Sequence, residues 1–97
     1  MRHFHRTPLA TPAVLEVADA YFPTIGLQSV GSGARTRNFV GELGKLELEV
    51  KVEGGHYTFV EAATDQPGES RLDRNVKRFF VRLHKLADPN HRLDAAY

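Results

Sequence analysis

Residues 45–63 read KLELEVKVEGGHYTFVEAA, and this stretch decides the fold. Polar and apolar side chains alternate without a break from 45 to 53, which is the period of a strand with one buried face. Gly54-Gly55 then favours a two-residue hairpin turn. Residues 56–63 include Tyr, Thr, Phe and Val, which favour strands. We therefore predict an antiparallel hairpin whose apolar face carries the core.

The length of the hairpin turn fixes which side chains face each other. A two-residue turn places Leu48 opposite Glu61 and puts alternate positions from 57 to 63 on the apolar face. A four-residue turn at 41–44 places Arg37 opposite Leu48 from the other side. Arg37 and Glu61 then bridge over Leu48, which offsets the cost of burying either charge alone. One interpretation is that the pair provides the polar group of a ligand cleft. The alternatives are that this face opens to water at the strand ends, or that the register differs by one residue.

Residues 70–88 predict the longest helix. Ser70 is a good N-cap, and Asp73 stands where a capping box usually carries Glu or Gln. Pro89 ends the pattern, because Pro cannot continue a helix. Large apolar side chains recur at helical spacing and predict one face that packs on the sheet: Leu72, Val76, Phe79, Phe80, Leu83 and Leu86.

Further elements are predicted before the hairpin. A helix begins at Thr11-Pro12, since Thr is a good N-cap and Pro is tolerated at the first helical position. That helix ends before Pro23, because the residue that precedes Pro avoids the helical conformation. The elements in chain order are a strand at 2–7, a helix at 12–21, a strand at 25–30 and a strand at 34–40.

These elements predict a single α+β domain that spans residues 1–97, with residues 90–97 as a mobile tail. The predicted sheet is antiparallel, has four to five strands and carries two helices on one face, in the order β-α-β-β-β-β-α. This order resembles, in shortened form, the helix-grip folds of START-like lipid and polyketide-cyclase proteins. It is equally similar to one repeat of the TATA-binding-protein-like fold. The resemblance covers the order of elements alone, so it implies no site residues.

The composition excludes several classes of function. The chain has 97 residues and no cysteine, which excludes a disulfide framework, a thiol nucleophile and a thiolate metal site. No apolar run has the length of a signal peptide or a membrane span, so we predict a soluble cytoplasmic protein without membrane contact. His3 and His5 offer two metal ligands, but any third would come from far along the chain, such as His56 or His84. We predict no metal site, no cofactor and no catalytic residues.

The charge is divided unevenly along the chain. Residues 70–92 carry seven Lys or Arg and two Asp, for a net charge of +5, whereas residues 42–61 carry two Lys and five Glu, for a net charge of −3. One side of the C-terminal helix is predicted to present most of these cations, opposite its apolar face. They are Arg71, Arg74, Arg78, Arg82 and Lys85. Such a surface attracts anionic partners or other copies of the chain.

The sequence therefore predicts a non-enzymatic binding or assembly module, with a homodimer as one hypothesis. The first alternative is a small-ligand binder with a cleft between the sheet and the C-terminal helix. The residues predicted to line that cleft are Tyr21, Arg37, Tyr57, Phe59 and Glu61. The second alternative is nucleic-acid binding through the basic side of the C-terminal helix, where cations can follow a row of phosphates.

Overall fold

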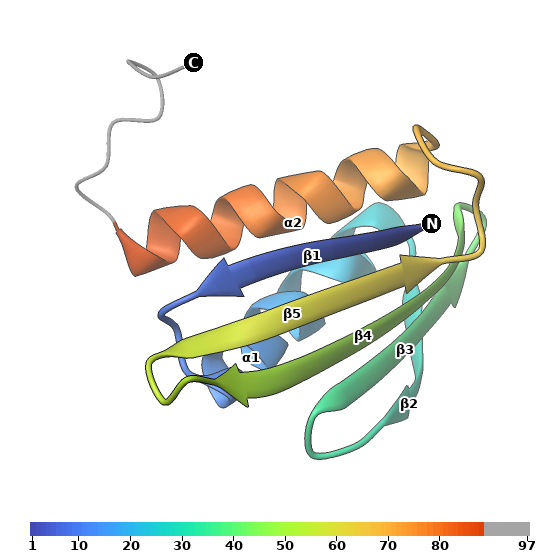
Figure 1. Cartoon of the computed structure of the whole chain (residues 1–97). Coiled ribbons are helices and arrows are strands. Elements are labelled where there is room, and N and C mark those ends of the chain that lie inside the picture. Colours follow the sequence, from blue (N-terminus) through green and yellow to red (C-terminus); the bar gives the residue numbers. More distant parts are fainter. Residues whose placement is uncertain (89–97) are drawn as a thin grey trace.

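Five antiparallel strands form one sheet in the computed structural model of this protein, which describes residues 1–88 (Figure 1). The strands lie in the order β1-β5-β4-β3-β2, so β1 and β2 are the two edges of the sheet. Their bounds are β1 Arg2–Thr7, β2 Gln28–Ser32, β3 Thr36–Gly41, β4 Gly44–Glu53 and β5 Tyr57–Thr64. The first strand of the chain therefore lies beside the last one.

Two helices cover one face of this sheet (Figure 1). The helix α1 (Thr11–Tyr21) packs on β4, and α2 (Arg71–Ala87) packs on β1 and β5. A short 3-10 helix, η1 (Phe22–Ile25), continues α1. The predicted α+β class, the order β-α-β-β-β-β-α and the antiparallel sheet are confirmed. The face of the sheet that points away from both helices is called the open face below.

The hairpin between β4 and β5 has a three-residue turn at 54–56, one residue longer than predicted. The two glycines of this turn take φ values of +63° and +75°, which glycine adopts without strain. Leu48 consequently pairs with Ala62 rather than with Glu61. The predicted register is wrong by one residue, which moves every side chain of β5 to the other face. The observed register buries a methyl group where the predicted one would bury a carboxylate.

The register between β3 and β4 is the predicted one, with Arg37 opposite Leu48. The segment before β3 differs from the prediction. Ile25, predicted to begin a strand, ends η1, and β2 begins at Gln28. Pro23 lies in the first turn of η1, where its missing N–H costs nothing, so helical structure continues past the point where the sequence indicates a stop.

The starts of the two helices differ in how well the sequence predicts them. Ser70 caps α2 as predicted: its Oγ accepts a hydrogen bond from the backbone N–H of Asp73 at 3.0 Å, and the Asp73 carboxylate accepts one from the backbone N–H of Ser70 at 3.4 Å. These two bonds complete a capping box. The start of α1 is wrong by one residue, because Thr11 is already helical and Ala10 is the N-cap.

Three phenylalanine rings lie at the centre of the core. The Phe22 ring centroid is 5.0 Å from that of Phe79 and 5.2 Å from that of Phe39, which joins η1 to α2 and β3. The aliphatic side chains buried around them come from both helices and from β4 and β5: Val14, Leu15, Leu46, Leu48, Val50, Val60, Leu72, Val76 and Leu83. Leu86, the last member of the predicted apolar face of α2, is 57% exposed instead.

Within residues 1–88, no helix combines the length and apolar character that crossing a membrane requires. The predicted mobile tail, residues 90–97, lies outside the described residues.

Candidate binding surface

The five residues predicted to line a cleft lie on both sides of the sheet. Tyr21 and Arg37 are on the side of the helices, whereas Tyr57, Phe59 and Glu61 are on the open face. The backbone of the sheet separates the two groups, so the structure does not bring the five residues together. The three-residue turn of the β4–β5 hairpin is the cause, because it shifts the register of β5.

Arg37 joins the β2–β3 ribbon to α1. Its Nε donates to the two carboxylate oxygens of Asp19 at 2.9 and 3.1 Å. Its Nη1 donates to the carbonyl oxygens of Gly33 and Thr36 at 2.8 Å each. Asp19 therefore takes the place that the sequence assigns to Glu61. These contacts give Arg37 a structural role.

Tyr21 joins α1 to α2. Its hydroxyl donates to Oδ1 of Asn75 at 2.8 Å, and its side chain is 8% exposed. The Arg82 guanidinium carbon lies over the Tyr21 ring, 4.9 Å from its centroid. Such a cation–π contact holds the long Arg82 side chain near α1. Tyr21 is thus part of the core and also supports a surface cation.

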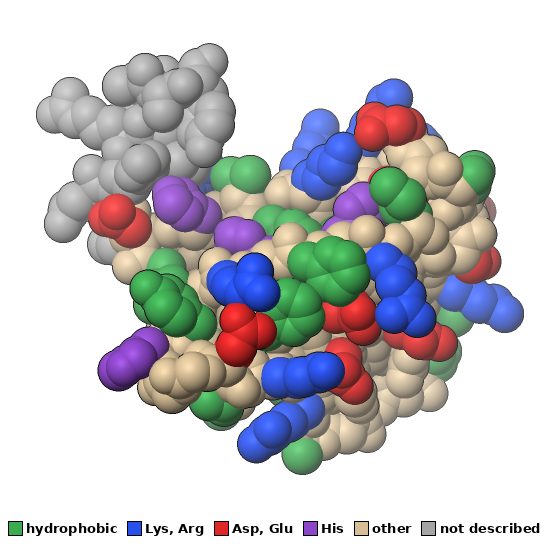
Figure 2. All heavy atoms as spheres, viewed as in Figure 1, with side chains coloured by type: hydrophobic (Ala, Val, Ile, Leu, Met, Phe, Trp, Pro, Cys, Tyr) green, Lys and Arg blue, Asp and Glu red, His purple; other side chains and the backbone are tan. Residues whose placement is uncertain are grey.

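Three ion pairs join charged side chains on the open face. Figure 2 shows Lys and Arg side chains interspersed with Asp and Glu over the strands. The ion pairs are Arg2–Glu61 at 3.4 Å, Arg6–Glu53 at 2.6 Å and Lys51–Glu49 at 3.7 Å. Two of the three cations come from β1, which lies beside the acidic hairpin although it is distant in sequence. Arg2 and Arg6 therefore offset two of the three net negative charges of residues 42–61.

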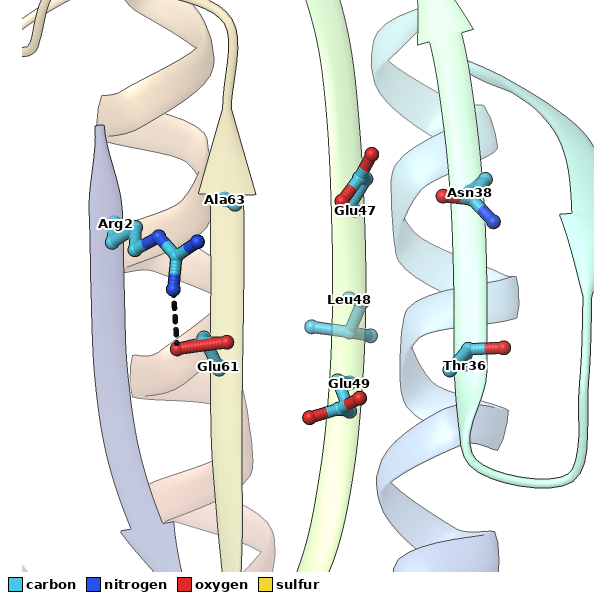
Figure 3. Close-up of a pocket in the computed structure, with 8 residues that line it drawn as sticks. All are labelled: Arg2, Thr36, Asn38, Glu47, Leu48, Glu49, Glu61 and Ala63. Atoms are coloured by element: carbon cyan, nitrogen blue, oxygen red, sulfur yellow. Dashed lines mark hydrogen bonds and ion pairs between the residues drawn. The ribbon is translucent and has the colours of Figure 1, made fainter.

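A hollow of about 350 Å³ lies on the open face (Figure 3). Arg2 on β1 points toward Glu61 on β5, while Glu47 and Glu49 project from β4. Ala63 lies between Arg2 and Glu47 in the register, and its small side chain leaves the space. The lining residues are Arg2, Thr36, Asn38, Glu47, Leu48, Glu49, Glu61 and Ala63. Two of the three carboxylates already have cationic partners, so the hollow is a polar depression of a balanced surface.

The exposed side of α2 carries cations that, unlike those of the open-face ion pairs, lie away from any carboxylate partner in the described residues. Arg71, Arg74, Arg78, Arg82 and Lys85, here called the basic stripe, are all exposed. At about 100° per residue they occupy roughly a quarter of the helix circumference. Within residues 1–88 the side chains of Arg71, Arg74, Arg78 and Lys85 form no ion pair or hydrogen bond. The basic stripe is therefore a row of cations without counter-charges in the described part of the chain.

A groove of about 230 Å³ lies beside the basic stripe, between α1 and the C-terminal half of α2. Its lining residues, which define the α1–α2 groove, are Val17, Ala20, Tyr21, Thr24, Arg82 and Leu86. Arg82 belongs to both the basic stripe and the groove, and the other lining residues carry no charge. The exposed Leu86 contributes most of the uncovered apolar wall on α2.

Sequence reasoning missed four of these lining residues: Val17, Ala20, Thr24 and Leu86. A weak signal for them was present. Positions 17 and 20 on α1 and position 24 on η1 follow one another at helical spacing and lie off the buried side, and none of them is charged. Leu86 lies at one margin of the apolar face of α2 and is exposed.

A buried cluster of hydrogen bonds joins β1 to the first turn of α2. The Asp73 carboxylate is fully buried, and its Oδ1 lies 2.8 Å from His3 Nε2 and accepts a hydrogen bond from Thr64 Oγ1 at 2.8 Å. Its Oδ2 accepts one from Ser70 Oγ at 2.6 Å. Burial raises the pKa of Asp73, but the hydrogen bonds from Ser70, His3 and Thr64 outweigh burial and hold that pKa well below its usual range.

The same four side chains do not form a nucleophilic site. A serine nucleophile needs a base that accepts its proton, and here Ser70 Oγ donates to a carboxylate whose lowered pKa makes it a poor base. His3 contacts that carboxylate from the other side. The cluster is a structural one that fixes the N-terminal end of α2 on β1.

His5 lies further along β1, also facing α2. Its ring stacks on Phe80 with centroids 5.0 Å apart, and its Nε2 is buried without a hydrogen-bond partner in the described part of the chain. Burial, and then the nearby His84, lowers the pKa of His5. His3 is occupied by Asp73. Among residues 1–88, no group of three or more His, Asp or Glu side chains is arranged to hold a metal ion.

Comparisons of this chain with protein-family models, with curated proteins and with solved structures found no match. Its function is therefore inferred from the surfaces themselves. Two of them lie side by side and share Arg82: the basic stripe and the α1–α2 groove.

Proposed function

We propose that this protein is a non-enzymatic, cytoplasmic binding module that binds an anionic partner through the basic stripe of α2. One observation carries the proposal. Four cations of the stripe lack counter-charges within residues 1–88, whereas three of the four cations on the open face, Lys45 being the exception, are paired with glutamates. Paired charges add little to the field around a protein, and unpaired ones of a single sign attract anions.

The dimensions of the basic stripe suit a partner with several negative groups. At 1.5 Å per residue, the stripe extends about 21 Å along α2 from Arg71 to Lys85. Capping at Ser70 and burial of Leu72, Val76, Phe79 and Leu83 hold this helix on the sheet. The cations are therefore presented on a fixed frame, which lowers the entropy lost on binding.

The test is retention on immobilised heparin, used as a general polyanion, in a salt gradient. Arg74→Glu together with Arg78→Glu is expected to lower the eluting salt concentration strongly, because two central cations are reversed. Lys45→Glu together with Lys51→Glu changes the net charge by the same amount on the open face and is the matched control. If both double variants elute alike, retention depends on net charge alone and the proposal is wrong.

A homodimer is the second candidate, and the edge strand β2 favours it. The two edges of the sheet differ: four of the six residues of β1 are Arg or His, which discourages pairing with another strand, whereas β2 reads QSVGS and has no charge and no proline. Val30 in β2 is 60% exposed, although a bulge at this residue interrupts the edge. Sedimentation of the wild type and of Val30→Lys tests this candidate, and a monomer at all concentrations would exclude it.

A small ligand between the sheet and α2 is a weaker alternative. The space between them holds buried side chains from both sides, among them Val60, Phe79 and Leu83. The predicted cleft residues on the open face cannot reach that space from the other side of the sheet.

A further inference from the structure

The α1–α2 groove and the basic stripe form one composite surface. The groove supplies an apolar wall from Val17, Ala20 and Leu86, and Arg82 stands at its border with the stripe. The cation–π contact with Tyr21 holds the Arg82 guanidinium at this border, 4.9 Å above the ring centroid. Apolar contact and positive charge are thus available to one occupant at the same time.

The two walls of the groove differ in charge. The residues that line the wall from α1 and η1 are uncharged. Asp19 bonds to Arg37, and Glu16, which lies one turn before Ala20, is not among the lining residues. The wall from α2 carries Arg82, with Arg78 one turn before it on the stripe. An occupant that complements this surface is apolar toward α1 and negative toward α2.

We infer that this surface binds an acidic amphipathic segment of a partner protein, which places apolar side chains in the groove and carboxylates against Arg78 and Arg82. This inference rests on the proposed function and names its partner. Amphipathic segments bind grooves between helices through apolar residues at helical spacing. Carboxylates pair well with guanidinium groups, because each carboxylate can accept two parallel N–H bonds.

A protein partner fits the surface better than a nucleic acid. Bases stack on exposed aromatic rings, and the basic stripe contains none. Within α2, Phe79 is buried and Phe80 stacks on His5 at the side of β1. The Tyr21 ring in the groove is covered by Arg82. Phosphates would use the cations but would leave the apolar wall without a partner.

The test measures the binding of two synthetic peptides to the full chain by fluorescence anisotropy. One peptide carries Leu at helical spacing along one side and Glu on the adjacent side, and the other has the same composition in scrambled order. The amphipathic peptide is expected to bind at least about tenfold more tightly than the scrambled one, because only the former can fill the groove and reach the stripe together. Its amide shift perturbations in NMR spectra are expected at Val17, Ala20 and Leu86.

Two double variants distinguish the contribution of the groove to binding from that of the basic stripe. Ala20→Gln with Leu86→Gln fills the groove with polar side chains at exposed positions without changing the charge. It is expected to reduce binding of the amphipathic peptide about tenfold, to the level of the scrambled one, and to leave heparin retention unchanged. Arg74→Glu with Arg78→Glu is expected to weaken both. Circular dichroism confirms that each variant is folded.

The remaining outcomes each decide against the inference. Equal binding of the two peptides, with normal stripe-dependent heparin retention, overturns the inference and leaves the proposed function intact. Tighter binding of duplex DNA or RNA than of either peptide, insensitive to the groove variant, assigns the surface to nucleic acid. A dimer that the groove variant dissociates assigns it to a second copy. Heparin retention that does not depend on the stripe overturns the proposed function itself.

Discussion

The Nε2 atom of His3 lies 2.8 Å from Oδ1 of Asp73, across 70 residues of sequence. This contact connects the edge strand β1 with the first turn of α2. It belongs to a cluster in which Ser70 and Thr64 donate to the same carboxylate. The frame that presents the basic stripe therefore depends on a carboxylate that is fully buried.

Removal of this carboxylate is expected to be costly. Asp73→Ala should lower the free energy of unfolding by about 3 kcal/mol, because the buried Thr64 and the part-buried His3 and Ser70 lose their partner and α2 loses part of its cap. Urea unfolding measures the change. Glu16→Ala removes an exposed carboxylate from α1 and should cost less than about 0.5 kcal/mol. Similar values for the two variants would contradict the structural role of the cluster.

The pH dependence of stability should show two separate limbs. The lowered pKa of Asp73 means that its contribution is present above about pH 4 and is lost as the pH falls below that value. The lowered pKa of His5 means that the unfolded chain binds a proton more readily than the folded chain does. Stability therefore also declines as the pH falls through the ordinary histidine range near 6.5.

His5→Phe should remove the upper limb and leave the lower one. The substitution keeps a ring that can stack on Phe80 and removes the group that titrates. Unfolding free energies measured between pH 5 and 8, a range set by about 1.5 units on either side of the ordinary histidine pKa, report the effect. The control is His56→Phe in the exposed hairpin turn, for which the upper limb should persist. A limb that survives in His5→Phe would have to arise from another group.

The register of β5 can be tested with one substitution at two adjacent positions. Ala62 is fully buried against the helices, whereas Ala63 faces the open side. Ala62→Glu places an unpaired carboxylate in the core and should cost several kcal/mol, on the order of 4, or abolish folding. Ala63→Glu should cost less than about 1 kcal/mol. The opposite ranking in urea unfolding would support the two-residue turn and its register.

The contact between Arg37 and Asp19 predicts a difference between two arginines of one ribbon. Arg37→Ala removes charge-assisted hydrogen bonds to Asp19 and bonds to two carbonyl oxygens, and should lower the unfolding free energy by about 2 kcal/mol. Arg37→Lys should not restore it, because an ammonium lacks the forked geometry. Arg35→Ala, at an exposed position in the same ribbon, should have an effect below about 0.5 kcal/mol.

The order and type of the elements could be predicted because they depend on local patterns. The alternation at 45–53 and the apolar spacing of 72–83 indicate their structures without reference to the rest of the chain. The cap at Ser70 is equally local. The register of β5 was not predictable in this way, because Gly54-Gly55 is compatible with two turn lengths. The choice between them depends on which side chains fit beneath α2.

The site was less predictable than the fold, because it depends on contacts between distant segments. The sequence identifies the cations of the basic stripe, but it does not show that β1 supplies counter-charges to the acidic hairpin. Nothing near Arg37 in the sequence indicates Asp19 as its partner. The Tyr21–Asn75 and His3–Asp73 contacts likewise join segments that only the complete fold brings together.

The position of β1 beside β5 also has a consequence for how the chain acquires its structure. The strands β2, β3 and β4 pair with strands that are adjacent in sequence, so their pairing closes only short loops. The strand β1 can pair only after residues 57–64 are available, and its other face is covered only after α2 has formed. On a ribosome, the first strand therefore emerges early and is paired late. We expect the amides of β3 and β4 to be protected before those of β1 during refolding, as pulse-labelled hydrogen exchange would reveal. We expect the contact of His3 with Asp73 to form after these strand pairings.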